Sequence, residues 1–554
     1  TRDDSDLNTV TWALSDTSIL GNTLQSSIVR DHLLVSTPRI VTDGTYQYTV
    51  LPKTTTITSF PDGSGGINTA TNSVMTLVKM STALPAHGLS TAQLGSELFI
   101  ANGTLRSLTN PKWEEHGFHI RPTLTAAATT PATGNLTSAK TYKYKAVFEI
   151  EDVAGNIHRS EPSESVSITT ATSTASPTAL GANITPHYPY TPTNKLSSRI
   201  ALYRTQAAGA IYNRVATLDN SMSTYSDLIS DTNALAGEFL YTEGGELPNT
   251  APISCWYVTA HRNRLFIISE NNRIFFTKEY EQTIGPSFVD TFFVPLDGMD
   301  HDKPTALASA GGELIIFREE SIWSISGDGP DNTGTGSYFT PRLITSSLGA
   351  LKGTPTLFSQ EGLFFQSPKG IHALTAEGPQ YLGAPVEDEV GADRIIQIFQ
   401  DQATETIRFV MSTKILVYNH LFKQWSVDKP AHLSSNTIVG GMLLDGTPHY
   451  LLSNRHLLKD SAGFKDSTTY IPLKMKTGWI AVENLQGFQR IYRFLLLGES
   501  KDKHVLSVKV YYDYDDSTVV DTYSFTTSSA ADANLQFRGH LSKQKCQAIK
   551  FEVE

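Results

Sequence analysis

Two glycine-rich segments contain residue types that could support catalysis or phosphate binding. Phe60–Gly66 resembles the loop of a serine nucleophile, but its order is Asp-Gly-Ser, and the strand–turn–helix context of an esterase is missing. Gly327–Gly336 follows an apolar strand, but a phosphate cradle needs a helix directly afterwards, and Tyr338–Pro341 does not read as helical. We therefore expect a flexible loop at the first segment and a connection between strands at the second.

Acidic clusters and histidines offer potential metal ligands. Asp297–Asp302 lacks the alternating oxygen donors and the distal glutamate of a calcium loop, so we expect a polar turn there. Asp513–Asp516 is a better candidate for a cation, although a hairpin turn is favoured. His116 and His119 are separated by an odd number of positions, so on one strand they point to opposite faces, which disfavours a shared metal ion.

Cys255 and Cys546 are the only cysteines and lie 291 residues apart. Two cysteines exclude a disulfide framework and a cysteine-based zinc site, and we interpret them as ordinary thiols. We therefore expect no catalytic, cofactor-binding or metal-binding residues and no cofactor.

The elements that must carry these residues are short hairpins. An apolar run, a polar turn and a second apolar run recur, with a step of 49 residues from Leu265 to Leu314 and again to Leu363, and of 44 residues to Ile407. Hairpins that repeat every roughly 40–50 residues predict the blades of a β-propeller. Since one hairpin cannot bury its own apolar face, several must pack around an axis. The apolar runs begin at Leu98, Leu265, Leu314, Leu363, Ile407 and Met442.

Composition restricts the classes of function. The 554 residues are too many for one compact core, so we expect about two to four domains. Only 18% of the residues are charged and the net charge is −11, which disfavours tight binding of nucleic acid through its phosphates. A low charge content also suits a protein that covers much of its surface with partners. No run approaches the roughly 20 apolar residues of a membrane helix, so we expect no stable membrane insertion.

The repeat is interrupted once, because 167 residues separate Leu98 from Leu265. The interruption contains alternating strands at Thr141–Ile150 and Val166–Ile168 and resembles a fibronectin type III module, through its Tyr-x-Tyr strand, Gly/Asn turn and Glu-Pro-Ser segment. We therefore expect an all-β chain: a degenerate β-propeller with an inserted fibronectin III-like β-sandwich and a C-terminal β-domain. The expected divisions are an N-terminal extended region with the first blade (1–120), the sandwich (121–250), the remaining blades (251–472) and the C-terminal domain (473–554).

The C-terminal segment carries a strand without alternation, Leu495–Leu497. A strand that is apolar on both sides is expected to be covered on both faces, which a subunit interface would do. The chain starts at Thr1 without Met and ends inside an alternating run, Ala548–Glu554, and the sequence alone does not decide whether either end is truncated.

Several stretches resemble the nozzle proteins, or tail tubular proteins B, of short-tailed bacteriophages. The similarity is best between about 255 and 500. The stretches that carry it are Ala260–Phe266 with Ile274–Thr277, Leu314–Trp323, Gly362–Phe365 with Lys369–Ile371, and Tyr418–His420 with Lys423–Ser426.

The resemblance implies a virion protein of the phage tail that assembles as a ring of about six copies. The ring would adjoin the portal and adaptor, tail fibres would be further partners, and DNA would pass through without specific binding. An acidic or neutral lumen would repel the phosphates of the DNA. Loops that project inward would gate the channel, and the candidate channel loop contains Gly327, Asp328, Gly329, Asp331, Gly334 and Gly336.

Two other functions remain open. A propeller-type enzyme that degrades host surface glycans would use a carboxylate pair or a tyrosine in the axial cleft. A carbohydrate-binding adhesion protein would use the inserted module as its contact. The oligomeric state separates the nozzle from both, since neither alternative requires a ring.

Overall fold

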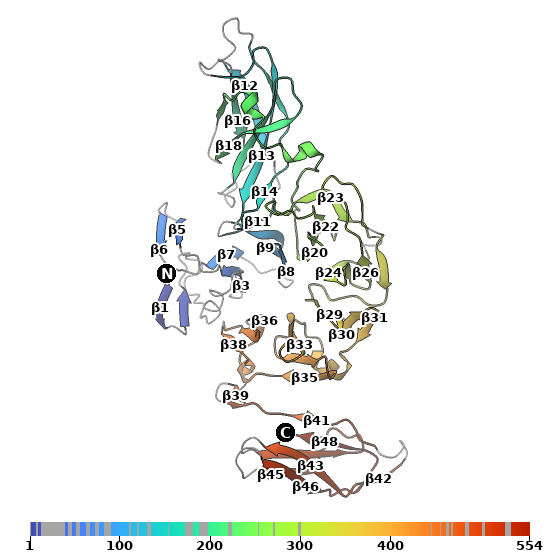
Figure 1. The fold of residues 1–554 in the computed structure, drawn as a ribbon. Helices are drawn as coiled ribbons and strands as arrows, with labels where there is room; N and C mark the ends of the chain where they lie inside the picture. Colours follow the sequence, from blue (N-terminus) through green and yellow to red (C-terminus); the bar gives the residue numbers. More distant parts are fainter. Residues whose placement is uncertain are drawn as a thin grey trace. The chain divides into compact units, whose positions relative to one another are not determined.

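The computed structural model is built almost entirely of β-strands in small antiparallel sheets, so the all-β expectation is confirmed (Figure 1). Before residue 90 the structure describes only the backbone of β1 (Arg2–Asp6), β2 (Thr9–Trp12), β3 (Arg39–Thr42), β4 (Gln47–Val50), β5 (Thr56–Pro61), β6 (Ile67–Thr71) and β7 (Leu77–Ser81). From residue 90 onward it describes the chain except for 110–111, 119–120, 130–133, 153, 172–180, 188–197, 220–223, 253, 270–271, 297–300, 339, 445, 455, 461–464, 467–468, 482–486, 501–504 and 527–532.

Small sheets made of consecutive strands follow one another along the chain. The first contains β8 (Ser90–Leu94), β9 (Glu97–Asn102), β10 (Thr104–Thr109) and β11 (Lys112–Glu115). The next four-stranded sheets are β20 (Tyr257–His261) to β23 (Phe288–Val294), β24 (Pro304–Ala310) to β27 (Arg342–Thr345), β28 (Leu357–Ser359) to β31 (Gly378–Tyr381) and β32 (Gln397–Asp401) to β35 (Gln424–Asp428). A three-stranded sheet follows, made of β36 (Ile438–Leu444), β37 (Thr447–Leu452) and β38 (Leu457–Lys459).

Five of the six apolar runs of the sequence form the second and third strands of these sheets, whereas the run at Met442 lies in β36, the first strand of its sheet. Their second strands are β21 (Arg264–Ile268), β25 (Glu313–Arg318), β29 (Gly362–Ser367) and β33 (Thr406–Val410), and their third strands are β22 (Ile274–Thr277), β26 (Ile322–Ile325), β30 (Gly370–Thr375) and β34 (Ile415–Asn419). All five residues of β21 and of β33 are buried, because these strands are covered on both faces.

Successive sheets pack against each other through their first strands. β8 lies against β20, β20 against β24, β24 against β28, β28 against β32, and β32 against β36. Packing of this kind is propeller-like, because each sheet buries its faces against its neighbours in the series.

The interruption in the repeat leaves and rejoins the series at adjacent points. The N–H of Cys255 donates to the carbonyl of Gly103 at 2.9 Å, and the N–H of Val258 donates to Oγ of Ser90 at 3.0 Å. A Cβ atom built on Gly117 would lie 3.0 Å from Cβ of Ala251. The sheet before the interruption therefore packs directly against the sheet after it.

The interruption folds as two facing sheets. One contains β12 (Thr123–Thr129), β16 (Gly181–His187) and β19 (Tyr225–Asp227). The other contains β13 (Thr141–Glu151), β14 (Ile157–Arg159), β15 (Val166–Thr169), β17 (Arg199–Thr205) and β18 (Tyr212–Asp219). The core between them includes Leu124, Tyr142, Tyr144, Ile200 and Leu218. We call residues 121–250 the inserted sandwich.

The chain divides into two compact units. The first contains 1–429 and 435–460, and the second contains 430–434 and 461–554. The sequence-based start of the C-terminal domain, residue 473, lies inside this second unit, which we call the C-terminal unit.

Two packed sheets make up most of the C-terminal unit. One has the order β41 (Met475–Lys476), β48 (Ile549–Val553), β44 (Val505–Tyr512) and β45 (Asp521–Thr526), and the other pairs β43 (Arg493–Ser500) with β46 (Ala533–His540). Phe494 lies opposite Gly539, and its ring centroid is 5.4 Å from that of Phe551 across the core. Because side chains alternate along a strand, Leu495 and Leu497 lie on the outer face of β43.

Helices contribute little to the described fold. Those that the structure describes are α2 (Asp231–Ala234), η2 (Tyr241–Gly244), η3 (Ala384–Val386), α3 (Glu387–Val390) and η4 (Ala431–Ser434). Within the described residues, no helix has the length and apolar character that a membrane span requires.

Candidate functional site

The candidate channel loop is held by hydrogen bonds to the preceding sheet. Nη1 of Arg262, in the β20–β21 turn, contacts Oδ1 of Asp328 at 2.7 Å and the carbonyl of Gly327 at 3.2 Å. Nη2 of Arg264 donates to the carbonyl of Pro330 at 2.5 Å. The structure thus places Gly327–Gly336 as an ordered connection between β26 and β27.

The same loop is also ordered internally. Oδ1 of Asp331 accepts the hydroxyl of Thr333 at 2.7 Å and the N–H groups of Thr335 and Thr333 at 2.8 and 2.9 Å, and these bonds lower the pKa of Asp331. Gly327, Gly329, Gly334 and Gly336 all have positive φ angles, which a residue with a side chain rarely adopts. The outer part of the loop, from Thr333 to Gly336, is exposed.

The two acidic clusters that the sequence suggested as metal ligands stabilise turns. Asp302 accepts N–H of Glu320 at 2.8 Å and Oγ–H of Ser321, so it stabilises the β25–β26 turn. Asp513–Asp516 connects β44 to β45, and Oδ2 of Asp513 contacts Nζ of Lys543 at 2.5 Å.

The two cysteines are buried free thiols, and burial raises the pKa of each. Three other sequence-based candidates, the glycine segment 62–66, residues 297–300 and His119, lie outside the described residues.

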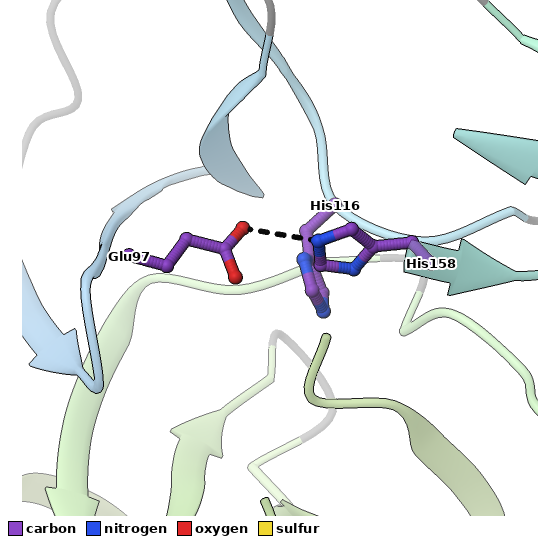
Figure 2. Close-up of side chains that lie close together, drawn as sticks. All are labelled: Glu97, His116 and His158. Atoms are coloured by element: carbon purple, nitrogen blue, oxygen red, sulfur yellow. Dashed lines mark ion pairs between the residues drawn. The ribbon is translucent and has the colours of Figure 1, made fainter. Parts of the chain in front are cut away.

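A buried cluster that the sequence did not indicate lies where the inserted sandwich meets the first sheet (Figure 2). Glu97 begins β9, His116 follows β11, and His158 is the middle residue of β14. One potential ligand atom from each of the three side chains lies within 4.8 Å of the other two. All three are buried, with exposed fractions of 1% for Glu97 and 3% for each histidine.

The hydrogen bonds of His116 define its tautomer. Nε2 lies 2.7 Å from the carbonyl of Pro286, and a carbonyl only accepts, so Nε2 carries the hydrogen. In the neutral ring, Nδ1 then presents its lone pair, and it lies 3.4 Å from Oγ of Ser107. The ring is oriented edge-on to that of His158, with 5.2 Å between the centroids.

His158 lies between two carboxylates. Its Nε2 atom is 3.2 Å from Oδ2 of Asp152 and 3.3 Å from Oε1 of Glu97. Asp152 also accepts the N–H of Ala154 and of Asn156, both at 2.8 Å, so it is well satisfied in its turn between β13 and β14. Glu97 forms an ion pair with His158 and also interacts with Ser107, but neither of its oxygens has a hydrogen bond of full geometry.

The pKa values of Glu97 and Asp152 shift in opposite directions. Burial raises the pKa of Glu97, and the neighbouring His158 offsets only part of this effect. For Asp152 burial acts in the same direction, but hydrogen bonds from His158 and Asn156 outweigh it and lower the pKa. Burial opposes the charge of His158, yet Glu97 and Asp152 together raise the pKa of His158 to about 9. Glu97 is therefore the acid whose negative charge is least compensated by the residues around it.

Backbone contacts fix this cluster in place. The N–H of Ile157 donates to the carbonyl of Thr283 at 2.9 Å, and the N–H of Gly285 donates to the carbonyl of Ile157 at 3.2 Å. A Cβ atom on Gly285 would lie 2.0 Å from Cε1 of His158, so only glycine allows this approach. The cluster can act as a buried ion pair that holds the inserted sandwich to its neighbours, or it can hold a cation.

The sequence-based interpretation tested His116 only against His119. It did not consider His116 with Glu97 and His158, because the three belong to different elements and no local spacing connects them. A search for histidines near the borders of the interruption would have indicated His116 but neither His158 nor Glu97.

Comparisons with known proteins add little to this geometry. No protein-family model matches the chain, and no curated protein matches it. Among solved structures, Kluyveromyces lactis Hsv2 aligns at 11% identity over 60% of this chain and 94% of its own, with a TM-score of 0.24. The extracellular domain of a hybrid two-component system from B. thetaiotaomicron aligns at 8% identity over 98% of this chain and 94% of its own, with a TM-score of 0.20. Such low TM-scores do not establish a shared overall fold.

Proposed function

We propose that this chain is a structural subunit of a hollow ring, the tail nozzle of a short-tailed bacteriophage, through which DNA passes during ejection. The observation that carries the proposal is the apolar outer surface of the C-terminal unit. Two large apolar side chains of β43 stand exposed there, Leu495 at 50% and Leu497 at 65%. Exposed apolar side chains gathered in one region mark a protein interaction site.

The β43–β46 sheet has the character of an interface. Leu495 and Leu497 pair with Arg538 and Gln536 of β46, so an apolar strip runs beside a polar strip on the outer face. An apolar centre with a polar margin is typical of interfaces between subunits. We commit to a second copy of this chain as the occupant, because the resemblance to nozzle proteins implies a ring of identical subunits.

The propeller-like series supplies the scaffold of each subunit in this proposal. We propose that the sheets from β8 to β38 belong to a ring-closed propeller, in which the strand pairs at 39–81 complete the circle. Closure would remove the exposed edges that an open series leaves at its ends. Copies of such a scaffold would surround the conduit, and the net charge of −11 would disfavour adhesion of DNA to its wall.

The candidate channel loop fits this proposal as an ordered element. Arg262 and Arg264 fix its first half, while Thr333–Gly336 remains exposed. We propose that this outer part approaches the passing DNA. Asp331, next to this part and without such an arginine contact among the described contacts, would then repel the phosphates and disfavour adhesion.

The mass of the purified full chain, measured by light scattering and native mass spectrometry, tests the proposal. We expect a closed oligomer of about six chains, with a central opening in electron micrographs. The double variant Leu495→Ser/Leu497→Ser should dissociate to monomers. The control Leu343→Ser, on β27, removes an apolar side chain that is 45% exposed in the other unit and should leave the oligomer intact.

Two outcomes would refute the proposal. One is a wild-type chain that stays monomeric at every concentration measured. The other is an oligomer that the double variant forms as readily as the wild type. A monomer that degrades bacterial capsule would favour the glycan-degrading enzyme instead.

A further inference from the structure

We propose that Glu97, His116 and His158 form a structural binding site for a divalent transition-metal ion, Zn²⁺ in the first place, which joins the inserted sandwich to the first sheet. The three side chains come from β9, from the segment after β11, and from β14. Two imidazoles and a carboxylate are the nitrogen and oxygen donors that zinc accepts in proteins.

Two contacts of His158 have the separation of neighbouring ligand atoms around a tetrahedral ion. With bonds of about 2.0–2.1 Å from zinc to nitrogen or oxygen, neighbouring ligand atoms lie about 3.3 Å apart. Oε1 of Glu97 is 3.3 Å from Nε2 of His158, and Oδ2 of Asp152 is 3.2 Å from the same nitrogen. A metal ion beside Nε2 of His158 would therefore meet Glu97 at a normal bond length, with Asp152 or a water in the fourth position.

His116 is oriented as a metal ligand. It donates Nε2–H to the carbonyl of Pro286 at 2.7 Å, so Nδ1 is an acceptor, and a metal ion would take the place of its long contact with Oγ of Ser107 at 3.4 Å. Metal-binding histidines usually donate their second ring nitrogen to a carbonyl or carboxylate in this way, which fixes the tautomer and the ring plane.

Glu97 supplies an independent reason to place a cation here. Its carboxylate is almost completely buried, and neither oxygen has a hydrogen bond of normal geometry. A buried carboxylate whose neighbouring donors, His158 and Ser107, are poorly aligned is costly to keep charged, and coordination to a cation removes this cost. The neighbouring Asp152 does not have the same need, because the turn around it already supplies N–H groups.

The position of the site indicates its role. It lies beside the contacts between Ile157 and Thr283 and between Gly285 and Ile157, which connect β14 to the loop between β22 and β23. An ion held by Glu97 of the first sheet and His158 of the inserted sandwich would fix the sandwich relative to that sheet. No catalytic step is needed for this role.

Binding of Zn²⁺ to the chelator-treated full-length chain tests the proposal. We expect one ion per chain in isothermal titration and in elemental analysis, and an increase in the unfolding temperature when Zn²⁺ is added. Co²⁺ in place of Zn²⁺ should give the strong visible absorption of a tetrahedral site. The variants Glu97→Gln and His158→Gln should each weaken binding by about 100-fold or more.

A matched control separates this site from accidental binding. His372 is also a buried histidine, on β30, but it lies outside the cluster, so His372→Gln should bind Zn²⁺ as the wild type does. The proposal is overturned if the wild type binds no stoichiometric metal, which leaves a buried ion pair only. It is equally overturned if Glu97→Gln and His158→Gln, checked for native circular dichroism, bind Zn²⁺ as tightly as the control. Should either variant fail to fold, the wild-type stoichiometry and Co²⁺ spectrum still decide the matter.

Discussion

Similar apolar strands are buried in the sheet series but partly exposed in the C-terminal unit. β33 and β43 both contain consecutive apolar residues, Ile407 with Phe409–Val410 in the first and Phe494–Leu497 in the second. Every residue of β33 is buried, because neighbouring sheets cover both of its faces. In β43 only one face meets a core, and Leu495 and Leu497 stand exposed.

This difference shows that a strand can be apolar because it contacts another molecule, even when the single chain leaves it exposed. The apolar pattern of β33 is explained by burial inside the chain. The pattern of β43 is explained only if something outside the chain covers its outer face, which is why the apolar surface carries the proposed function. Substitutions that remove apolar or charged side chains from each region test this difference.

The largest effect is expected in the sheet series, from Phe409→Ala. The ring of Phe409 is fully buried and lies 5.3 Å from that of Trp425 and 5.9 Å from that of Phe364. Removing it leaves a cavity, so the free energy of unfolding should fall by about 3–5 kcal/mol. Urea unfolding measures the change. The control Leu421→Ala removes a side chain that is 67% exposed, and a loss as large there would contradict the comparison.

A pH effect is expected in the C-terminal unit, through Glu552 of β48. Burial disfavours its charge, but Lys474, Lys476 and Lys509 surround the carboxylate at 2.7 to 3.3 Å and lower the pKa of Glu552 to about 2. Since the folded pKa lies below the ordinary value of 4.5, Glu552 stabilises the unit above pH 4.5, and this contribution disappears as the pH falls toward 2.

Hydrogen exchange of the amides of β44 and β48 can follow this loss. In the variant Glu552→Gln the protection at neutral pH should be lower, and its decrease between pH 4.5 and 2 should be smaller than in the wild type. Glu554→Gln is the control, because that side chain is 43% exposed and contacts only Lys509 at 3.1 Å. Identical pH profiles for Glu552→Gln and the wild type would show that the three lysines do not stabilise this carboxylate.

The smallest effect on stability is expected from Leu497→Ser. Its side chain is already 65% exposed, so the free energy of unfolding of the dissociated chain should change by no more than about 0.5 kcal/mol. Urea unfolding at low protein concentration measures it. A loss comparable to that of Phe409→Ala would mean that the chain itself buries this face, and the apolar surface would then lose its significance.

The sequence predicts the middle of each sheet far better than its edges. The runs that start at Leu265, Leu314, Leu363 and Ile407 correspond to β21, β25, β29 and β33, because second strands are covered on both sides and must be apolar. The outermost strands gave no such signal. In β27 and β31 no residue is fully buried, so their sequences have little apolar pattern to recognise, and in β35 the pattern is limited to the half-buried Trp425 and Val427.

The candidate site was less predictable than the fold for a physical reason. Glu97, His116 and His158 are brought together by the packing of the inserted sandwich against the first sheet, and the nearest two are 19 residues apart in the chain. Alternation within a strand, the rule applied to His116, describes only neighbours on one element. It does not describe contacts at a junction between elements.

Gly117 and Ala251, at the two ends of the inserted sandwich, lie close together, which makes this position suitable for engineering. The backbone leaves the sheet series and comes back to it at almost the same point, so about 130 residues form an insertion in an otherwise continuous scaffold. A short linker across this gap should spare the scaffold, and a foreign module with neighbouring ends could be grafted there.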